Sequence, residues 1–168
     1  ALQMLAQMRK QGLEPDSITV NAAISACAKS ILWERALHVL MAMPEHALES
    51  DVINYSAAIS ACSKGKQVER ALRMLTEMPE HNLHPDIFSY NTVISMCADV
   101  EEWERALGIM VEMQEGSLQA DVISYNVLIS VCQKAGQWQG SLHILANMRE
   151  EALEPNVISY SAAISACE

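Results

Sequence analysis

The side chains with the most versatile chemistry in this 168-residue chain are five cysteines, which recur at a fixed interval. They are Cys27, Cys62, Cys97, Cys132 and Cys167, each 35 residues after the previous one. Zinc sites and disulfide frameworks need close groups of thiols, and no cysteine here has a second one nearby. The spacing favours packing, because a free cysteine behaves as a small apolar side chain, and unpaired thiols are typical of a reducing compartment.

The histidines and carboxylates form no pattern typical of catalysis or metal binding. The histidines do not converge: they are His38, His46, His81, His84 and His143, and although His46 and His81 share a column of the 35-residue interval, the next unit has Gly116 there. A Gly-rich phosphate loop is missing, and so is the His-x-Glu with Pro-Cys-x-x-Cys signature of zinc deaminases. We therefore expect no enzyme activity, metal, cofactor or small-molecule substrate in this chain, and any catalytic domain would lie outside it.

The 35-residue interval extends to the whole sequence. It recurs in isoleucine, serine, leucine and methionine columns, for example Ile24, Ile59, Ile94, Ile129 and Ile164. Self-similarity at a period of 20 to 50 residues indicates a repeat architecture. Counted from Ser17, the full units are 17–51, 52–86, 87–121 and 122–156, with partial units 1–16 and 157–168. The periodicity predicts one continuous array over residues 1–168, and we expect it to be an excerpt of a longer protein.

Each unit is predicted to fold into two helices. In the second unit the apolar spacing predicts a first helix from Ile53 to about Lys64, a turn over 65–67, and a second helix from Val68 to Met78. Pro44 and Pro79 fall late in second helices, where proline predicts an early helix end or a kink. One helix pair cannot bury its apolar face alone, so the pairs must stack into an all-α solenoid.

A helical wheel separates two faces of the first helix. In the second unit the apolar face holds Tyr55, Ala58, Ile59 and Cys62, and it predicts that the tyrosines, like the cysteines, pack between helices. Positions 2, 5, 9 and 13 lie on the opposite arc: Ile53, Ser56, Ser60 and Lys64. A ladder of aliphatic, hydrogen-bonding and ammonium groups suits single-stranded nucleic acid, whose bases can be wedged, read and held by their phosphates.

The segment VISYNVLISVCQKAGQWQGSLHILANMREEALEPN (122–156) resembles the pentatricopeptide repeat family, and the resemblance covers the whole chain. Its motifs are Tyr-Asn or Tyr-Ser in the first helix, Ala-Leu in the second, and Pro-Asp or Pro-Asn at the boundary. The resemblance implies a right-handed superhelix of stacked 35-residue helix–turn–helix repeats. It also implies binding of single-stranded RNA, one base per repeat, in organellar RNA processing, stability, editing or translation.

The resemblance also assigns roles to residues. The base-reading pairs would be the fifth and last residues of each repeat: Asn21 with Asp51, Ser56 with Asp86, Asn91 with Asp121, and Asn126 with Asn156. The base-wedging residues at position 2 would be Ile18, Ile53, Phe88, Ile123 and Ile158. The phosphate contacts at position 13 would be Lys29, Lys64 and Lys134. By the family's pairing rules the expected target is 5′-U-G-U-(C/U)-3′.

Three features bear on other interpretations. Asp51, Asp86 and Asp121 each precede a helix and could act as N-caps, a role compatible with base reading. The formal charge of −10, from 21 acidic and 11 basic residues, opposes a phosphate-rich partner and favours a helical protein-binding scaffold or assembly factor. The third unit departs most from the RNA pattern, because it has Asp99 where a phosphate lysine is expected.

Partners and compartment follow from the same observations. We expect single-stranded RNA as the partner, together with other proteins of an RNA-processing complex. No apolar run approaches the roughly 18 to 20 residues that span a bilayer, so no membrane association is expected. The family resemblance implies a mitochondrial or plastid location.

Overall fold

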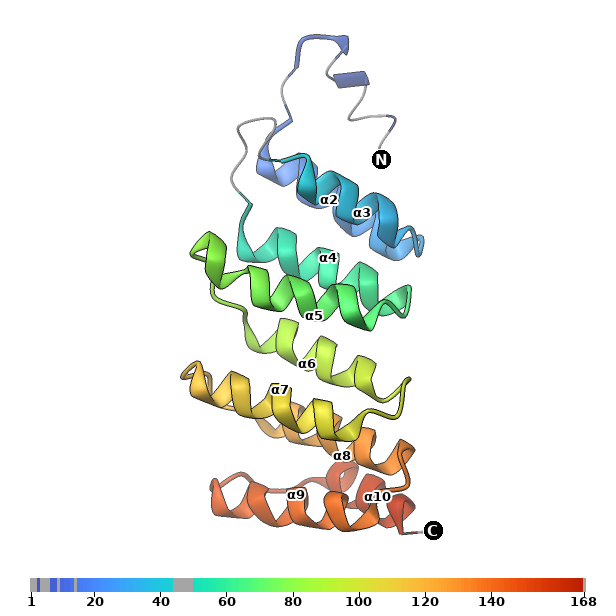
Figure 1. The fold of residues 1–168 in the computed structure, drawn as a ribbon, viewed down its shortest axis with the longest axis vertical. Helices are drawn as coiled ribbons and strands as arrows, with labels where there is room; N and C mark the ends of the chain where they lie inside the picture. Colours follow the sequence, from blue (N-terminus) through green and yellow to red (C-terminus); the bar gives the residue numbers. More distant parts are fainter. Residues whose placement is uncertain (1–2, 4–6, 9, 14, 44–49, 168) are drawn as a thin grey trace. The chain divides into compact units, whose positions relative to one another are not determined.

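The computed structural model describes residues 3, 7–8, 10–13, 15–43 and 50–167 of the chain. Within these ranges every regular element is a helix, and none is long and apolar enough to cross a membrane. The chain divides into two compact units, residues 1–89 and 90–168. Each is described by itself below, and Figure 1 gives the element labels.

Both units consist of antiparallel helices that pack on their neighbours in the sequence. The helices are α2 (Ser17–Lys29), α3 (Trp33–Met41), α4 (Val52–Lys64), α5 (Val68–Glu77), the short 3-10 helix η2 (Pro79–His81), α6 (Ile87–Cys97), α7 (Trp103–Glu115), α8 (Val122–Lys134), α9 (Trp138–Glu150) and α10 (Val157–Ala166). In the first unit α4 packs on α2, α3 and α5, and in the second α8 packs on α7, α9 and α10 (Figure 1). This stacking of helical hairpins confirms the predicted all-α solenoid.

Helix boundaries follow the repeat. The first helix of a repeat begins directly after an aspartate or asparagine whose side chain accepts a backbone N–H, as Asp51 does from Asn54. The turn to the second helix contains a residue with positive φ at one fixed place: Ile31, Lys66, Glu101 and Gly136. Glycine at position 136 adopts this left-handed conformation without the Cβ penalty that the other three residues carry.

The core lies between helices of adjacent repeats. Its fully buried columns are Ile24, Ile59, Ile94 and Ile129 in the first helices and Met43, Met78, Met113 and Met148 in or just after the second. Cys27, Cys62, Cys97 and Cys132 are buried beside them, as expected for packing residues, whereas Cys167 is exposed. Burial raises the pKa of the Cys62 thiol to about 11, so this group is an inert core residue rather than a nucleophile.

The prolines predicted to end or kink the second helices can be compared with the structure. α5 ends at Glu77 and gives way to η2, which starts at Pro79, so the expected early end is confirmed there. Pro44 lies outside the described residues. Trp33 and Trp103, which begin α3 and α7, are half-buried, whereas Trp138, which begins α9, is 47% exposed.

Candidate nucleic-acid interface

The second residue of every first helix is an exposed apolar side chain. These residues are Ile18, Ile53, Phe88, Ile123 and Ile158, and they are between 59% and 78% exposed. Each lies in the first turn of its helix, immediately after the N-terminal residue. Isolated exposed apolar residues are common, but exposed apolar residues at the same place in every repeat indicate a binding surface.

The last residue of each repeat caps the following helix. Asp51, Asp86 and Asp121 accept the backbone N–H of the residue three positions on, each through Oδ1 at 2.8 Å. The cap therefore uses the same oxygen in all three aspartates. The predicted N-cap role of these aspartates is confirmed, and it does not use the second carboxylate oxygen.

The fifth residue of each repeat is less accessible than the wheel predicts. Asn21, Asn91 and Asn126 are half-buried, and Ser56 is only 8% exposed. The Ser56 Oγ lies 2.7 Å from the Val52 carbonyl oxygen and 2.8 Å from the Ser89 Oγ. Serine is short enough for the neighbouring repeat to cover it, so Ser56 offers a base little more than the edge of its hydroxyl.

One predicted pair is in direct contact. The Asn126 Nδ2 donates to the Asn156 Oδ1 at 3.4 Å, and Asn156 also caps α10. The Ser56 and Asp86 side chains meet through Ser89, whose hydroxyl donates to the Asp86 Oδ1 at 2.7 Å. The residues of these two pairs are thus brought together across adjacent helices, although 30 residues separate them in sequence.

Sequence reasoning missed a column of polar residues, two of which, Ser89 and Ser159, join these pairs. The residues of this column occupy the third position of a repeat, are fully buried, and are Asn54, Ser89, Ser124 and Ser159. We call them the bridging residues. A polar column at the 35-residue interval, three residues after each capping residue, was the available signal, because a side chain there can complete a reciprocal cap.

The position-13 lysines have two different environments. Lys29 and Lys64 are the exposed last residues of α2 and α4, and no described acidic group pairs with either. The Lys134 Nζ lies 3.7 Å from the Asp99 Oδ1. Asp99 therefore leaves its own repeat without an ammonium group, and it also forms an ion pair with the lysine of the next repeat.

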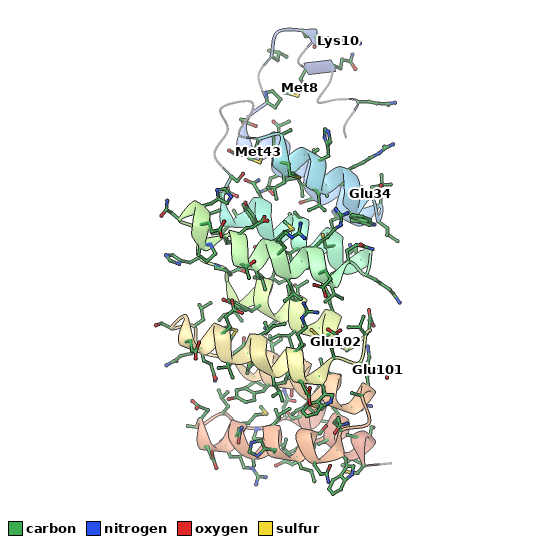
Figure 2. All side chains as sticks on the ribbon, viewed as in Figure 1. Met8, Lys10, Glu34, Met43, Glu101 and Glu102 are labelled. Atoms are coloured by element: carbon green, nitrogen blue, oxygen red, sulfur yellow. The ribbon has the colours of Figure 1, made fainter. Side chains whose placement is uncertain are left out.

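Most other acids of the third repeat lie away from the first helices. Glu101 and Glu102 are in the turn that precedes α7, where Figure 2 labels them. Glu104, Glu112 and Glu115 are exposed on α7 itself, which is a second helix. The strongly acidic charge of this repeat is thus concentrated outside the row of position-2, position-5 and position-13 residues.

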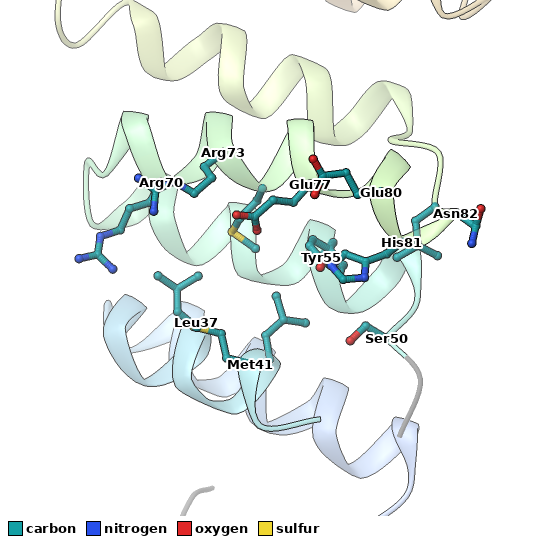
Figure 3. Close-up of a pocket in the computed structure, with 13 residues that line it drawn as sticks. Leu37, Met41, Ser50, Tyr55, Arg70, Arg73, Glu77, Glu80, His81 and Asn82 are labelled. Atoms are coloured by element: carbon teal, nitrogen blue, oxygen red, sulfur yellow. The ribbon is translucent and has the colours of Figure 1, made fainter. Parts of the chain in front are cut away.

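A cleft in the first unit opens beside the second helices α3 and α5 (Figure 3). Its lining includes Met41, Tyr55, Arg73 and His81. Ser50, at its edge, follows directly after residues 44–49, which the structure does not describe. None of the predicted RNA-contacting residues lines this cleft.

The tyrosines of three first helices lie in the helix interfaces. Burial raises the pKa of the phenols of Tyr55, Tyr90 and Tyr125, and a nearby glutamate adds to the effect in each case. These side chains pack between helices, as predicted. In the described part of the chain no three His, Cys, Asp or Glu side chains come close enough to hold a metal ion.

These features define a class of protein: a tandem array of helical hairpins with one polar pair and one exposed apolar residue repeated at a fixed place. Family models agree with this class. The pentatricopeptide repeat domain model matches residues 108–168, the PPR repeat family model matches 50–99, and the PPR repeat model matches 18–47 and 88–118. The chain belongs to the pentatricopeptide repeat family.

Solved structures show the same fold at low identity. The maize pentatricopeptide repeat protein PPR10 has 20% identity over 96% of this chain with a TM-score of 0.87, and this chain spans 23% of PPR10. The PPR domain of Arabidopsis thaliana protein-only RNase P 1, solved in complex with tRNA, has 12% identity, coverage of 99% and 88% of the two chains, and a TM-score of 0.82. PPR10 has also been solved with an 18-nt psaJ RNA element. No curated protein sequence gives a significant match to the chain.

Proposed function

We propose that this chain binds single-stranded RNA selectively, one base per repeat, with 5′-U-G-U-(C/U)-3′ as its preferred element. The observation that carries the proposal is the exposed apolar residue at position 2 of every repeat. It lies in the first turn of the helix that the last residue of the preceding repeat caps. Burial in the fold explains the other apolar columns, whereas these side chains are mostly exposed. A base stacked against such a side chain would remove both surfaces from water.

The physical mechanism has three parts. The position-2 side chain packs against the base, the reading pair contacts the base edge, and the ammonium group of Lys29 or Lys64 contacts phosphate. Each aspartate offers its Oδ2 to an imino or amino group of the base, because Oδ1 serves the helix cap. A good two-atom contact discriminates by about 1 to 3 kcal/mol between bases, the magnitude known for base readout in DNA.

The assignment of bases follows the pairs. Asn21 with Asp51, and Asn91 with Asp121, select U in the first and third repeats. Ser56 with Asp86 selects G. Asn126 with Asn156 selects a pyrimidine, C before U, and the RNA runs 5′ to 3′ along the chain direction. These assignments rest on the family's pairing rules.

The biological role proposed is RNA processing, stability, editing or translation in mitochondria or plastids. It is supported by membership of the family. The PPR10 and RNase P 1 complexes support RNA as the partner class, since those related folds were solved with RNA.

Selection from a randomised single-stranded RNA pool tests the proposal. We expect enrichment of U-G-U followed by a pyrimidine, with binding weakened by Asn91→Ala and strengthened at low salt. Binding without enrichment, or enrichment that Asn91→Ala leaves unchanged, contradicts sequence-selective reading. Ser117→Ala, which removes an exposed hydroxyl from the loop after α7, is the matched control and should have no effect.

A second candidate is a protein-binding scaffold, favoured by the exposed glutamates of α7. Glu104, Glu112 and Glu115 would contact a basic partner surface. Neutralising all three to glutamine separates the candidates: RNA binding should be unchanged or slightly stronger, whereas a scaffold would lose its partner.

A further inference from the structure

Two of the bridging residues, Ser89 and Ser159, touch both members of a reading pair. The Ser159 Oγ lies 2.5 Å from the Asn126 Oδ1 and 3.2 Å from the Asn156 Oδ1. The Ser89 Oγ similarly contacts the Ser56 Oγ at 2.8 Å and the Asp86 Oδ1 at 2.7 Å. Because these side chains are fully buried, they can set how each pair is oriented without touching RNA themselves.

A serine at the bridging position has only one proton to donate. In the third pair the Ser124 hydroxyl donates to the Asp121 Oδ1 at 2.9 Å, as expected for a charged acceptor in competition with a neutral one. The Asn91 Oδ1 is then buried without a hydrogen-bond partner in the described part of the chain. In the fourth pair the last residue is neutral, and the Ser159 hydroxyl lies closer to Asn126.

Asparagine at the bridging position has a different capacity. The Asn54 Oδ1 accepts the Asp51 backbone N–H at 3.0 Å, which fixes the orientation of the amide because only the oxygen can accept. Its Nδ2, with two protons, is buried, and no described group accepts from it. Asn54 can therefore donate to a neighbour without taking a proton away from the capping aspartate.

The neighbour that can accept is Asn21. Thirty-three residues separate Asn21 from Asn54, the same offset that joins Ser56 to Ser89 and Asn126 to Ser159. The Asn21 Oδ1 is buried and lacks a donor among the described residues. The unpaired Asn54 Nδ2 and the unpaired Asn21 Oδ1 thus occupy the same two repeat positions that are hydrogen-bonded in the second and fourth pairs. A buried polar group without a partner is costly, so a hydrogen bond from the Asn54 Nδ2 to the Asn21 Oδ1 would be favourable.

We infer that Asn54 is a specificity-determining positioning residue, which holds the side-chain amide of Asn21 so that the Asn21 Nδ2 points toward RNA. Ser124, in contrast, leaves the side-chain amide of Asn91 able to rotate by about 180° and exchange its oxygen and nitrogen. The inference rests on the proposed function. Two reading pairs of identical composition, Asn21 with Asp51 and Asn91 with Asp121, thus differ in selectivity because their bridging residues differ.

The consequence for bases follows from donor and acceptor order. With the amide held in this orientation, the pair presents one donor, the asparagine Nδ2, and one acceptor, the aspartate Oδ2. These match the O4 and the N3–H of uracil. A reversed amide presents two adjacent acceptors, which match the N1–H and N2–H groups of guanine. The first repeat therefore rejects guanine, and the third tolerates it.

Affinities of the full chain for short single-stranded RNAs test this, with U or G at the first or third place of the U-G-U-C element. Asn54→Ser should lower the U-over-G preference at the first base by about fivefold, equivalent to one net hydrogen bond, and leave the third base unchanged. Ser124→Asn should raise the preference at the third base by a similar factor. Serine is the natural bridging residue of the other three pairs, so Asn54→Ser is expected to fold, and its thermal unfolding is measured alongside.

The outcomes separate the two levels of interpretation. A wild-type chain that prefers no base at any place overturns the proposed function and this inference together. A wild-type chain that selects bases, with Asn54→Ser weakening U and G equally, overturns only the inference, because a merely structural residue would lower affinity without changing preference.

Discussion

Replacing Asp99 with asparagine should strengthen RNA binding by releasing Lys134. The two side chains form an ion pair at 3.7 Å and are 41% and 56% exposed, respectively. While Asp99 is charged, a phosphate must displace it to reach the ammonium group of Lys134. The Asp99→Asn substitution keeps the size of the side chain and removes the competing charge.

The size of the effect follows from this geometry. Two unit charges about 4 Å apart interact with roughly 1 kcal/mol in water, and exposed pairs are worth about 0 to 1 kcal/mol. We therefore expect up to about a fivefold gain in affinity. Each lysine–phosphate contact on a single strand contributes about 0.7 to the slope of log K against log salt, so the slope should steepen from about −1.4, for Lys29 and Lys64, to about −2.1.

Fluorescence anisotropy with a labelled U-G-U-C RNA over a salt series measures both quantities. Glu115→Gln is the matched control, because it removes the same charge from an exposed position of the same repeat. Adding Lys134→Ala to Asp99→Asn should abolish the gain. An equal gain in Glu115→Gln, or an unchanged slope in Asp99→Asn, would refute the role of the ion pair and leave only a general charge effect.

Two further predictions concern stability and thiol reactivity. Gly65→Ala should lower the free energy of unfolding by about 1 to 3 kcal/mol, because a Cβ there would lie 2.7 Å from the Trp33 Cγ. Gly108→Ala should instead raise it by about 0.5 to 1 kcal/mol, because a Cβ there meets nothing within 4 Å in a helix interior. Urea unfolding checks both, and changes of the same sign would be inconsistent with this packing. Iodoacetamide at pH 8 should label exposed Cys167 and spare buried Cys62. The Cys62 thiol has a pKa of about 11, so roughly one molecule in a thousand carries the thiolate at this pH. Mass mapping of the labelled cysteines measures this, and equal labelling of both would contradict it.

The helices could be predicted from sequence because each reflects a local rule repeated in every unit. The structure has α4 over Val52–Lys64 and α5 over Val68–Glu77, each within one residue of the boundaries predicted from apolar spacing and turn residues. Burial of the cysteine and methionine columns follows from the same wheel. The stacking of the helix pairs was predictable because a single pair cannot bury its own apolar face.

The details of the interface depend on contacts between repeats, which a wheel does not contain. Ser56 was expected on the open arc, yet the neighbouring repeat covers it through Ser89. The pairing of Lys134 with Asp99 joins residues 35 apart, and either residue alone gives no sign of it. The bridging residues form a polar column that the sequence does contain, but their contacts with the preceding repeat are visible only where adjacent repeats meet.

Exchanging one reading residue tests the central claim most directly. Asn91→Ser converts the third pair into the serine–aspartate pair of the second repeat, within an otherwise unchanged chain. Selection from a randomised RNA pool should then move the preferred element from U-G-U-pyrimidine to U-G-G-pyrimidine, with the other three bases retained. An unchanged third base, or a general loss of preference at all four, would contradict base reading by these pairs.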